Sequence, residues 1–300
     1  MHARRMARVK RAIHGWLVLD KPVGLSSAQA VGRARWLTGA AKAGHAGTLD
    51  PAASGVLPIA FGEATKTVGH AVDVAKSYRF SVRWGEARDT DDVEGRVIAR
   101  SAHVPEAHAI TAALDRFRGE IEQVPPVYSA VKVEGQRAYA RARRNEEVTL
   151  AARPVRVDAL ELIRAAGRCA EFRLDCGKGT YVRAIARDLA EALGTVGYVT
   201  QLRRTRVGPF GESDAISLEN LEELVHSSPL TEQLLPVEAA LVDIPALALT
   251  DTQAEHLRHG RVVCVEHIGD GPVCAMASGR PVALAEVANG EARPVRVFNL

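Results

Sequence analysis

Two segments of this 300-residue chain alternate apolar and polar residues with a strict period of two. Successive side chains of a strand point to opposite faces, so each segment predicts a strand with one buried face and one solvated face. Strands of a fully covered parallel sheet are instead continuous apolar runs. The pattern therefore favours a largely antiparallel sheet. The apolar positions are Tyr78, Phe80, Val82 and Trp84 in the first segment and Ala170, Phe172, Leu174 and Cys176 in the second.

Three segments have the 3.6-residue periodicity of helices that could cover one face of such a sheet. We expect a helix over residues 28–37, with Ser27 as its N-cap and Gly39 beyond its end, and a second over residues 106–117. A third is expected over residues 182–193, with Gly194 as a left-handed cap. The predicted class is α+β (mixed α/β), a largely antiparallel sheet flanked by helices.

The chain changes character after residue 210. Ser217 precedes an apolar pattern of helical spacing, and Pro229, Pro236 and Pro245 then break the chain into short pieces. The last residues contain short β-rich runs between Gly and Pro turns. We predict a basic N-terminal arm over residues 1–13, a main domain over residues 14–244 and a small β-rich domain over residues 245–300.

Charge is distributed unevenly along the chain. Residues 1–210 contain 34 Lys and Arg against 22 Asp and Glu, whereas residues 211–255 contain ten acids and no Lys or Arg. Residues 132–156 and 178–206 each carry a balance of +4. With the N-terminal arm they could form a surface that neutralises phosphates. A solvated face is an equally good explanation of the charge alone.

Several classes of protein do not fit this sequence. The chain has no run approaching the ~20 apolar residues of a membrane span, and its basic start is not followed by a secretory apolar segment. Its four cysteines show no metal-like spacing, and the acidic stretch around Asp89 lacks the glycine and glutamate positions of a calcium loop. We therefore expect a cytoplasmic protein with free thiols and no metal.

The most unusual segment is the loop from Gly44 to Gly55, GHAGTLDPAASG. Its glycines permit tight backbone conformations, and Pro51 biases Asp50 toward an extended conformation. Asp50 is the only acid between Asp20 and Glu63. By itself such a carboxylate is a turn former or a cap as readily as a catalytic group.

In the context of the whole chain, this loop resembles a known family. The blocks GWLVLDKPVG, AGHAGTLDPAASGVLPIAFGEATK, PPVYSAVK and GKGTYVR, with residues 78–95 and 135–142, resemble the TruB family of bacterial tRNA pseudouridine-55 synthases from about residue 14 to residue 210. The resemblance implies a pseudouridine synthase-type sheet and a PUA-like RNA-binding module at residues 245–300. It also implies an isomerase that converts one uridine of the tRNA T loop to pseudouridine without a cofactor.

The resemblance assigns the catalytic residues. Asp50 matches the catalytic aspartate, which could attack C1′, attack C6 or remove a sugar proton, and the sequence does not choose among these routes. Arg183 matches an arginine that pairs with this aspartate and favours its charged form. Tyr78 matches an aromatic ring that stacks on the flipped-out base. Without the family match, Tyr78 would be the first core residue of its strand.

Further positions match residues that contact the RNA. His45 fills space near the displaced base, Asp92 reaches the base edge, and Lys21 places a phosphate or the catalytic loop. Tyr181 and Leu202 line the pocket, although simple core packing would also explain both. The positions expected to hold phosphates are Arg137, Arg141, Arg143 and Arg144. The chain has Arg143-Arg144-Asn145 where relatives often have Arg-x-Gly, which puts the contacts of this loop in doubt.

The expected partner is the T-arm stem-loop of tRNA, bound by a monomer that needs no protein partner and no guide RNA. A non-catalytic RNA-binding or tRNA-folding protein on the same scaffold is the main alternative. A guide-RNA-directed catalytic subunit ranks lower, because the chain lacks an extended N-terminal region and a longer C-terminal module.

Overall fold

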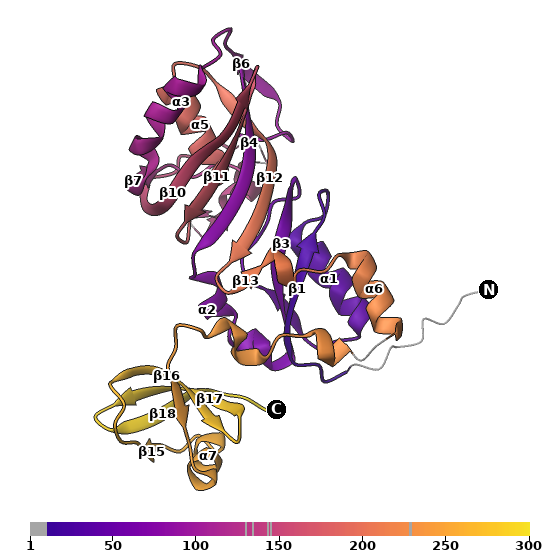
Figure 1. Cartoon of the computed structure of the whole chain (residues 1–300), viewed down its shortest axis with the longest axis vertical. Helices are drawn as coiled ribbons and strands as arrows, with labels where there is room; N and C mark the ends of the chain where they lie inside the picture. Colours follow the sequence, from indigo (N-terminus) through magenta and orange to yellow (C-terminus); the bar gives the residue numbers. More distant parts are fainter. Residues whose placement is uncertain (1–10, 130, 134, 143, 145, 228–229) are drawn as a thin grey trace, which may run out of the picture.

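The computed structural model describes residues 11–129, 131–133, 135–142, 144, 146–227 and 230–300. Figure 1 shows a larger body built on one long sheet, with a smaller β-rich body beneath it that holds the C-terminus. Helices lie against the larger sheet, whose neighbouring strands are mostly antiparallel. The predicted α+β class is therefore confirmed.

The larger sheet brings together strands from both ends of the main domain. All neighbouring strands on its main path pair antiparallel except β3 and β12, which run parallel. In spatial order the sheet contains β1 (Gly15–Lys21), β3 (Ala53–Phe61), β12 (Gly197–Val207), β4 (Lys76–Trp84), β11 (Cys169–Cys176), β10 (Arg153–Ala166) and β7 (Gly119–Gln123), with β2 (Ala43–His45) on β3 and β13 (Phe210–Gly211) on β12.

One half of this sheet is covered on a single face. The apolar residues of β4 and β11 that the alternation identified are buried, and Phe80 stacks on Phe172 with ring centroids 5.1 Å apart. The cover consists of α5 (Val182–Ala192), α3 (Ala107–Ala113) and the 3₁₀ turn Leu114–Phe117. The predicted single helix over residues 106–117 is thus an α-helix that tightens into a 3₁₀ turn. Helix α5 ends as predicted, with Gly194 at a φ of +69°.

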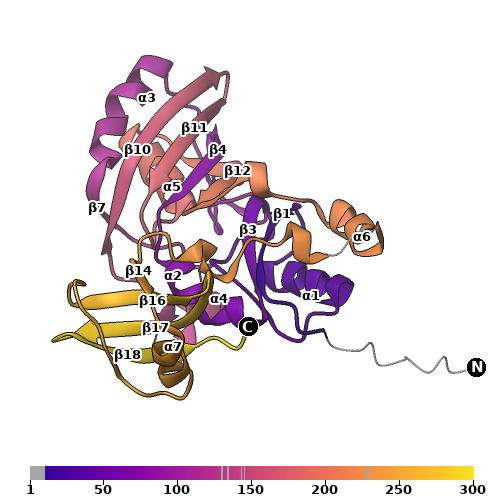
Figure 2. The same cartoon turned by 60° about the horizontal axis from the view of Figure 1, so that its bottom comes forward.

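The other half of the sheet is covered on both faces, unlike the half-covered strands that the sequence predicted. In β1 and β3, alternate residues enter different cores. Leu17 and Leu57 pack beneath α1 (Ser27–Thr38) and α6 (Leu218–Ser227), whereas Trp16 and Val56 pack on the opposite side. Figure 2 shows α1 and α6 together on the side of β1 and β3 away from the C-terminal body.

Helix α1 begins one residue earlier than predicted. Ser26 is its N-cap and forms a capping box with Gln29. Ser27 is 2% exposed, and its hydroxyl is bonded to the backbone of Leu49. The predicted cap is therefore wrong because this hydroxyl is used for a long-range contact.

The C-terminal body has its own five-stranded sheet and its own core. Cys274, Leu284 and Phe298 also pack into the core that contains Trp16, which joins the two bodies. Helix α7 was not predicted. The elements are β14 (Ala246–Ala248), α7 (Asp251–Arg258), β15 (Val263–Cys264), β16 (Gly271–Ala277), β17 (Arg280–Ala288) and β18 (Glu291–Val297).

The remaining elements are short. Within the described residues, no helix is long and apolar enough to cross a membrane. Residues 1–10, which make up most of the predicted basic arm, lie outside the described part of the chain. The short elements are the 3₁₀ turns Gly62–Lys66, Glu212–Asp214, Leu230–Gln233 and Val237–Ala240, with α2 (Val68–Val72), β5 (Glu86–Arg88), β6 (Val97–Arg100), β8 (Lys132–Val133), β9 (Gln136–Arg137) and α4 (Ala138–Ala142).

Candidate active site

The loop that carries Asp50 connects β2 to β3 and is fixed through its backbone. Ser27 Oγ donates to the Leu49 carbonyl at 2.9 Å and accepts from the Leu49 amide at 2.8 Å. The Gly24 amide donates to the Pro51 carbonyl at 2.8 Å, and the Ala53 amide closes the turn on the Asp50 carbonyl at 3.0 Å. The residues on both sides of Asp50 are therefore held by elements distant in the sequence.

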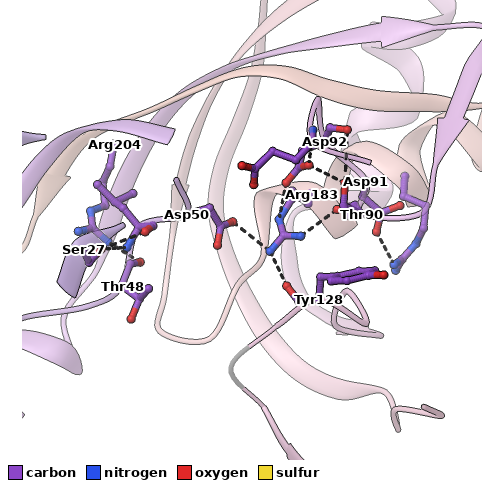
Figure 3. Close-up of polar contacts among 12 residues, drawn as sticks. Ser27, Thr48, Asp50, Thr90, Asp91, Asp92, Tyr128, Arg183 and Arg204 are labelled. Carbon is purple, nitrogen blue, oxygen red and sulfur yellow. Dashed lines mark hydrogen bonds and ion pairs between the residues drawn. The ribbon is translucent and has the colours of Figure 1, made fainter. Parts of the chain in front are cut away.

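Arg183 contacts the side chain of Asp50 directly, as Figure 3 shows. Its Nη2 lies 3.0 Å from Asp50 Oδ2, and the side chain of Arg183 is 5% exposed against 37% for Asp50. Arg183 also donates to the carbonyls of Thr90 at 2.8 Å and Tyr128 at 2.9 Å. These bonds fix the guanidinium behind a carboxylate that faces outward.

Asp92 lies on the far side of Arg183, in a turn that precedes β6. Its Oδ2 is 3.6 Å from Arg183 Nε, while its Oδ1 accepts bonds from Thr90 Oγ1 at 2.6 Å and from the Glu94 amide at 3.0 Å. The structure thus brings together Asp50, Arg183 and Asp92, which are far apart in the sequence. Asp92 itself is 5% exposed.

The neighbouring Asp91 was not predicted to matter. Its φ is +60°, and its carboxylate pairs with Arg187 of α5 at 3.2 Å. Burial raises the pKa of Asp91 to about 6, although Arg187 opposes this effect. The Asp91 carbonyl accepts a bond from the Val199 amide at 3.0 Å, which ties the turn to β12.

A small pocket opens beside this group of side chains. Asp50, Asp92, Arg183, Val199 and Leu202 are among the residues that line it. Its volume of about 10 Å³ has room for roughly one water molecule.

Tyr78 lies on β4, opposite Arg204 on β12. It is 8% exposed and belongs to the core beneath α5, so its role as a core residue holds whatever else it does. Burial raises the pKa of its phenol, and the charge of Arg204 opposes the rise.

Arg204 is the site residue that the sequence reasoning missed. It is 1% exposed and donates to the carbonyls of Val56 at 2.9 Å, Gly47 at 3.0 Å and Thr48 at 3.4 Å. A signal was available, because Arg204 lies two residues after Leu202 on the same strand and therefore on the same face. Figure 3 draws Asp50 between Arg204 and Arg183.

Lys21 is buried in the protein without RNA. Its ammonium donates to the carbonyls of Leu25 at 2.7 Å and Pro22 at 2.8 Å and lies 3.5 Å from that of Pro51. Of the two roles predicted for Lys21, the geometry fits the placement of the catalytic loop. Burial lowers the pKa of Lys21 to about 8.

His45, at the end of β2, is half-buried. Burial and the charge of Arg204 lower the pKa of its imidazole, which favours the neutral ring. Its Nδ1 is buried and has no hydrogen-bond partner among the described residues.

Tyr181 and Leu202 differ in their relation to the pocket. Leu202 lines it and also packs against both cores of the larger sheet. Tyr181 is the N-cap residue of α5, where its amide donates to Gln123 Oε1 at 2.8 Å. The Arg153 guanidinium lies 5.5 Å from the centroid of the Tyr181 ring.

The expected phosphate-binding arginines carry their own counter-ion. Arg141 and Arg144 both pair with Glu146, at 2.9 Å and 2.6 Å. Arg144 also donates to Gln136 Oε1 at 2.7 Å. Arg137 is exposed on β9, and Arg143 lies outside the described residues.

The second basic run, residues 178–206, is only partly exposed. Arg183 and Arg204 are buried. Arg187 pairs with Asp91 and Asp188, and Arg203 pairs with Asp20 and Glu212. Lys178 and Arg206 are exposed, and a phosphate-binding face from this run stays a prediction.

Comparisons with known proteins give one consistent family. Residues 35–182 match the family described as "TruB family pseudouridylate synthase (N terminal domain)". Residues 183–242 match "tRNA pseudouridylate synthase B C-terminal domain", and residues 244–299 match "tRNA Pseudouridine synthase II, C terminal".

Similar proteins cover almost the whole chain. A protein of Rhodospirillum rubrum named tRNA pseudouridine synthase B is 53% identical over 98% of this chain and 100% of its own length. Its namesake in Rhodopseudomonas palustris is 54% identical over 98% of this chain and 83% of its own length. Among solved structures, a Cbf5-Nop10-Gar1 complex contains a chain with a TM-score of 0.74 and 27% identity, over 95% of this chain and 84% of that one.

Proposed function

Because this chain belongs to the TruB family of pseudouridylate synthases and is a tRNA pseudouridine synthase, we propose that its target is uridine 55 in the T loop of tRNA. The observation that carries the chemical assignment is the 3.0 Å ion pair between Asp50 and Arg183 at the mouth of a pocket. The resemblance of the Asp50 and Arg183 blocks to the pseudouridine-55 synthases supports the choice of uridine.

In this proposal Asp50 is the group that reacts with the substrate. Arg183 contacts one carboxylate oxygen, Oδ2, so the other oxygen can face the sugar or the base. A charged hydrogen bond from a fixed guanidinium orients the carboxylate. An ionised carboxylate suits attack at C1′, attack at C6 and removal of a sugar proton, and these routes share the same positioning of Asp50.

The other pocket residues would hold the base while its bond to the sugar is broken. We assign the stacking contact to Tyr78, the lining of the pocket to Leu202 and a contact with the bound base to Tyr181 at the start of α5. Asp92 would contact the base edge, and His45 would fill space beside the displaced base. The bound base would exclude water from the site while its bond to the sugar is broken.

We further propose that residues 14–244 form the catalytic domain and residues 245–300 a PUA-like RNA-binding domain. The separate sheet and core of residues 246–297 support this division. The protein would act on the T arm in the cytoplasm as a monomer, without a guide RNA or a protein partner.

The test is tritium release from C5 of labelled uridine, because C5 loses its hydrogen when it bonds to C1′. The substrate is a T-arm stem-loop, and a second stem-loop carries cytidine at position 55. Wild type is expected to release tritium from the first RNA and none from the second. Asp50→Asn should release none while retaining RNA binding.

A matched control removes an acid outside the pocket. Asp73 is 63% exposed and pairs with Lys178, so Asp73→Asn should retain full activity. Release from the cytidine-55 RNA would contradict the proposed position. If Asp50→Asn is active, the assignment of Asp50 is wrong. If the purified protein is inactive on every RNA, the non-catalytic or the guide-directed alternative is favoured.

A further inference from the structure

The guanidinium of Arg204 occupies an unusual place beneath the catalytic loop. It is 1% exposed, and burial lowers its pKa. No ion pair to a carboxylate is found for it within the described residues, where its hydrogen bonds go to backbone carbonyls. A buried charge without a carboxylate partner is costly, so its retention calls for a specific role.

The three carbonyl contacts of Arg204 lie on both sides of Asp50 in the sequence. Nη2 and Nη1 bind Gly47 and Thr48, which precede Asp50 in the loop. Nε binds Val56, which follows it in β3. A planar fork of donors can hold these groups in one fixed geometry, whereas the single ammonium of a lysine cannot.

The same guanidinium also reaches the proposed stacking residue. Tyr78 lies directly opposite Arg204 in the pairing of β4 with β12. The charge of Arg204 acts on the buried phenol and opposes the rise in its pKa. Arg204 therefore lies next to both the loop and the ring.

We propose that Arg204 is a positioning residue that sets the catalytic loop and the Tyr78 ring relative to each other. This inference rests on the roles proposed above for Asp50 and Tyr78. Arg204 does not touch the substrate. It connects the two groups that do, so its loss should slow the reaction without weakening RNA binding.

The experiment compares Arg204→Lys and Arg204→Gln with Arg203→Gln. Arg203 is the next residue on β12, is 36% exposed and pairs with Asp20 and Glu212. Single-turnover tritium release at saturating RNA, the RNA Kd and the urea unfolding midpoint are measured for each protein. We expect both Arg204 variants to lose about 100-fold in rate, with a Kd within about threefold of wild type. Arg203→Gln should keep its rate.

A double-mutant cycle with Tyr78→Phe separates positioning from a general effect on the fold. Phenylalanine keeps the ring and removes the phenol oxygen on which the charge of Arg204 acts. If Arg204 acts partly through this oxygen, the loss of rate caused by Arg204→Lys should be at least about threefold smaller in the Tyr78→Phe protein than in wild type. A structural role would not produce this coupling.

Several outcomes would overturn the proposal. The first is an unchanged rate in Arg204→Lys, and the second is a loss of RNA affinity in the Arg204 variants as large as their loss of rate. The third is a double variant whose loss of rate equals the product of the losses in the two single variants. The fourth is failure of both Arg204 variants to fold. The proposed function is judged separately by Asp50→Asn. An inactive Asp50→Asn beside a fully active Arg204→Lys would leave that function standing and refute the inference alone.

Discussion

Gly55 lies where β3 and β12 approach most closely, and its replacement tests how far the site depends on this contact. Gly55 pairs with Arg204 in the parallel register, and its φ is +101°. A Cβ at this position would lie 2.1 Å from the Arg204 carbonyl oxygen, against at least 3.4 Å in an ordinary contact. In Gly55→Ala the two strands must therefore separate by more than an ångström, which only a backbone movement can provide.

Two effects contribute to the expected destabilisation by Gly55→Ala. A non-glycine residue in this backbone region costs about 1–3 kcal/mol, and overpacking of a close contact costs about 1–3 kcal/mol more. We expect the free energy of unfolding in urea to fall by about 4 kcal/mol. The movement also displaces Arg204, so single-turnover release by the folded protein should fall about 100-fold.

Gly167→Ala is the matched control for Gly55→Ala. Gly167 also has a positive φ, +55°, but a Cβ there would meet nothing within 4 Å. Gly167→Ala should lower the free energy of unfolding by only about 1 kcal/mol, the cost of a non-glycine residue at a positive φ, and should leave the rate unchanged. Equal stabilities of the two variants, or a full rate in Gly55→Ala, would refute the argument that the contact between β3 and β12 positions the site.

Two further predictions concern charged groups near the RNA-facing side. Burial raises the pKa of Asp91 to about 6, so between about pH 4 and pH 6 the folded protein binds this proton more tightly than the unfolded chain, and stability falls as the pH rises. Asp91→Asn should remove this fall. The difference in the free energy of unfolding, variant minus wild type, should therefore rise by up to about 3 kcal/mol between pH 4 and pH 7. A difference that does not change with pH would contradict the assignment. Glu146→Gln should tighten RNA binding several-fold at low salt and steepen the salt dependence of the RNA Kd, because Glu146 neutralises Arg141 and Arg144 in the free protein. Glu147→Gln makes the same charge change one residue away, and an equal gain in this control would show that the gain reflects net charge alone.

The parts of the fold that the sequence predicted are those governed by local periodicity. β4 and β11 have one buried face, so their alternation is visible, and α5 has a continuous apolar face against them. β1 and β3 are buried on both faces, and a continuous apolar run does not distinguish such a strand from a buried helix. The parallel pairing of β3 with β12 joins segments about 150 residues apart and has no local signal.

Helix α7 shows a different limit. Only Ala254 and Leu257 of this eight-residue helix are buried, so its apolar pattern is too short to recognise. The capping box between Thr250 and Gln253 was the available signal, because a threonine followed three residues later by glutamine is typical of a helix start.

At the site, the sequence identified residue types with a distinctive motif and missed those whose role comes from burial. Asp50 and Arg183 lie in recognisable blocks, and the structure places them in contact. Arg204 lies in a basic run that resembles a solvated surface, and only the pairing of β12 with β3 and β4 buries it. The charge of an arginine predicts exposure by default, so its burial could not be inferred from composition.

The position of Asp50 depends on contacts that no neighbouring residue provides. Ser27 of α1 holds Leu49, Arg204 of β12 holds Gly47 and Thr48, and Arg183 of α5 holds the Asp50 carboxylate. These contacts form only when the first strands of the chain have paired with β12, which is far away in the sequence. If Asp50 is catalytic as proposed, a carboxylate held in this way is fixed before the substrate arrives, so little reorganisation is needed during the reaction. We therefore expect the reaction rate to respond to substitutions such as Gly55→Ala, which replace none of the residues proposed to contact the substrate.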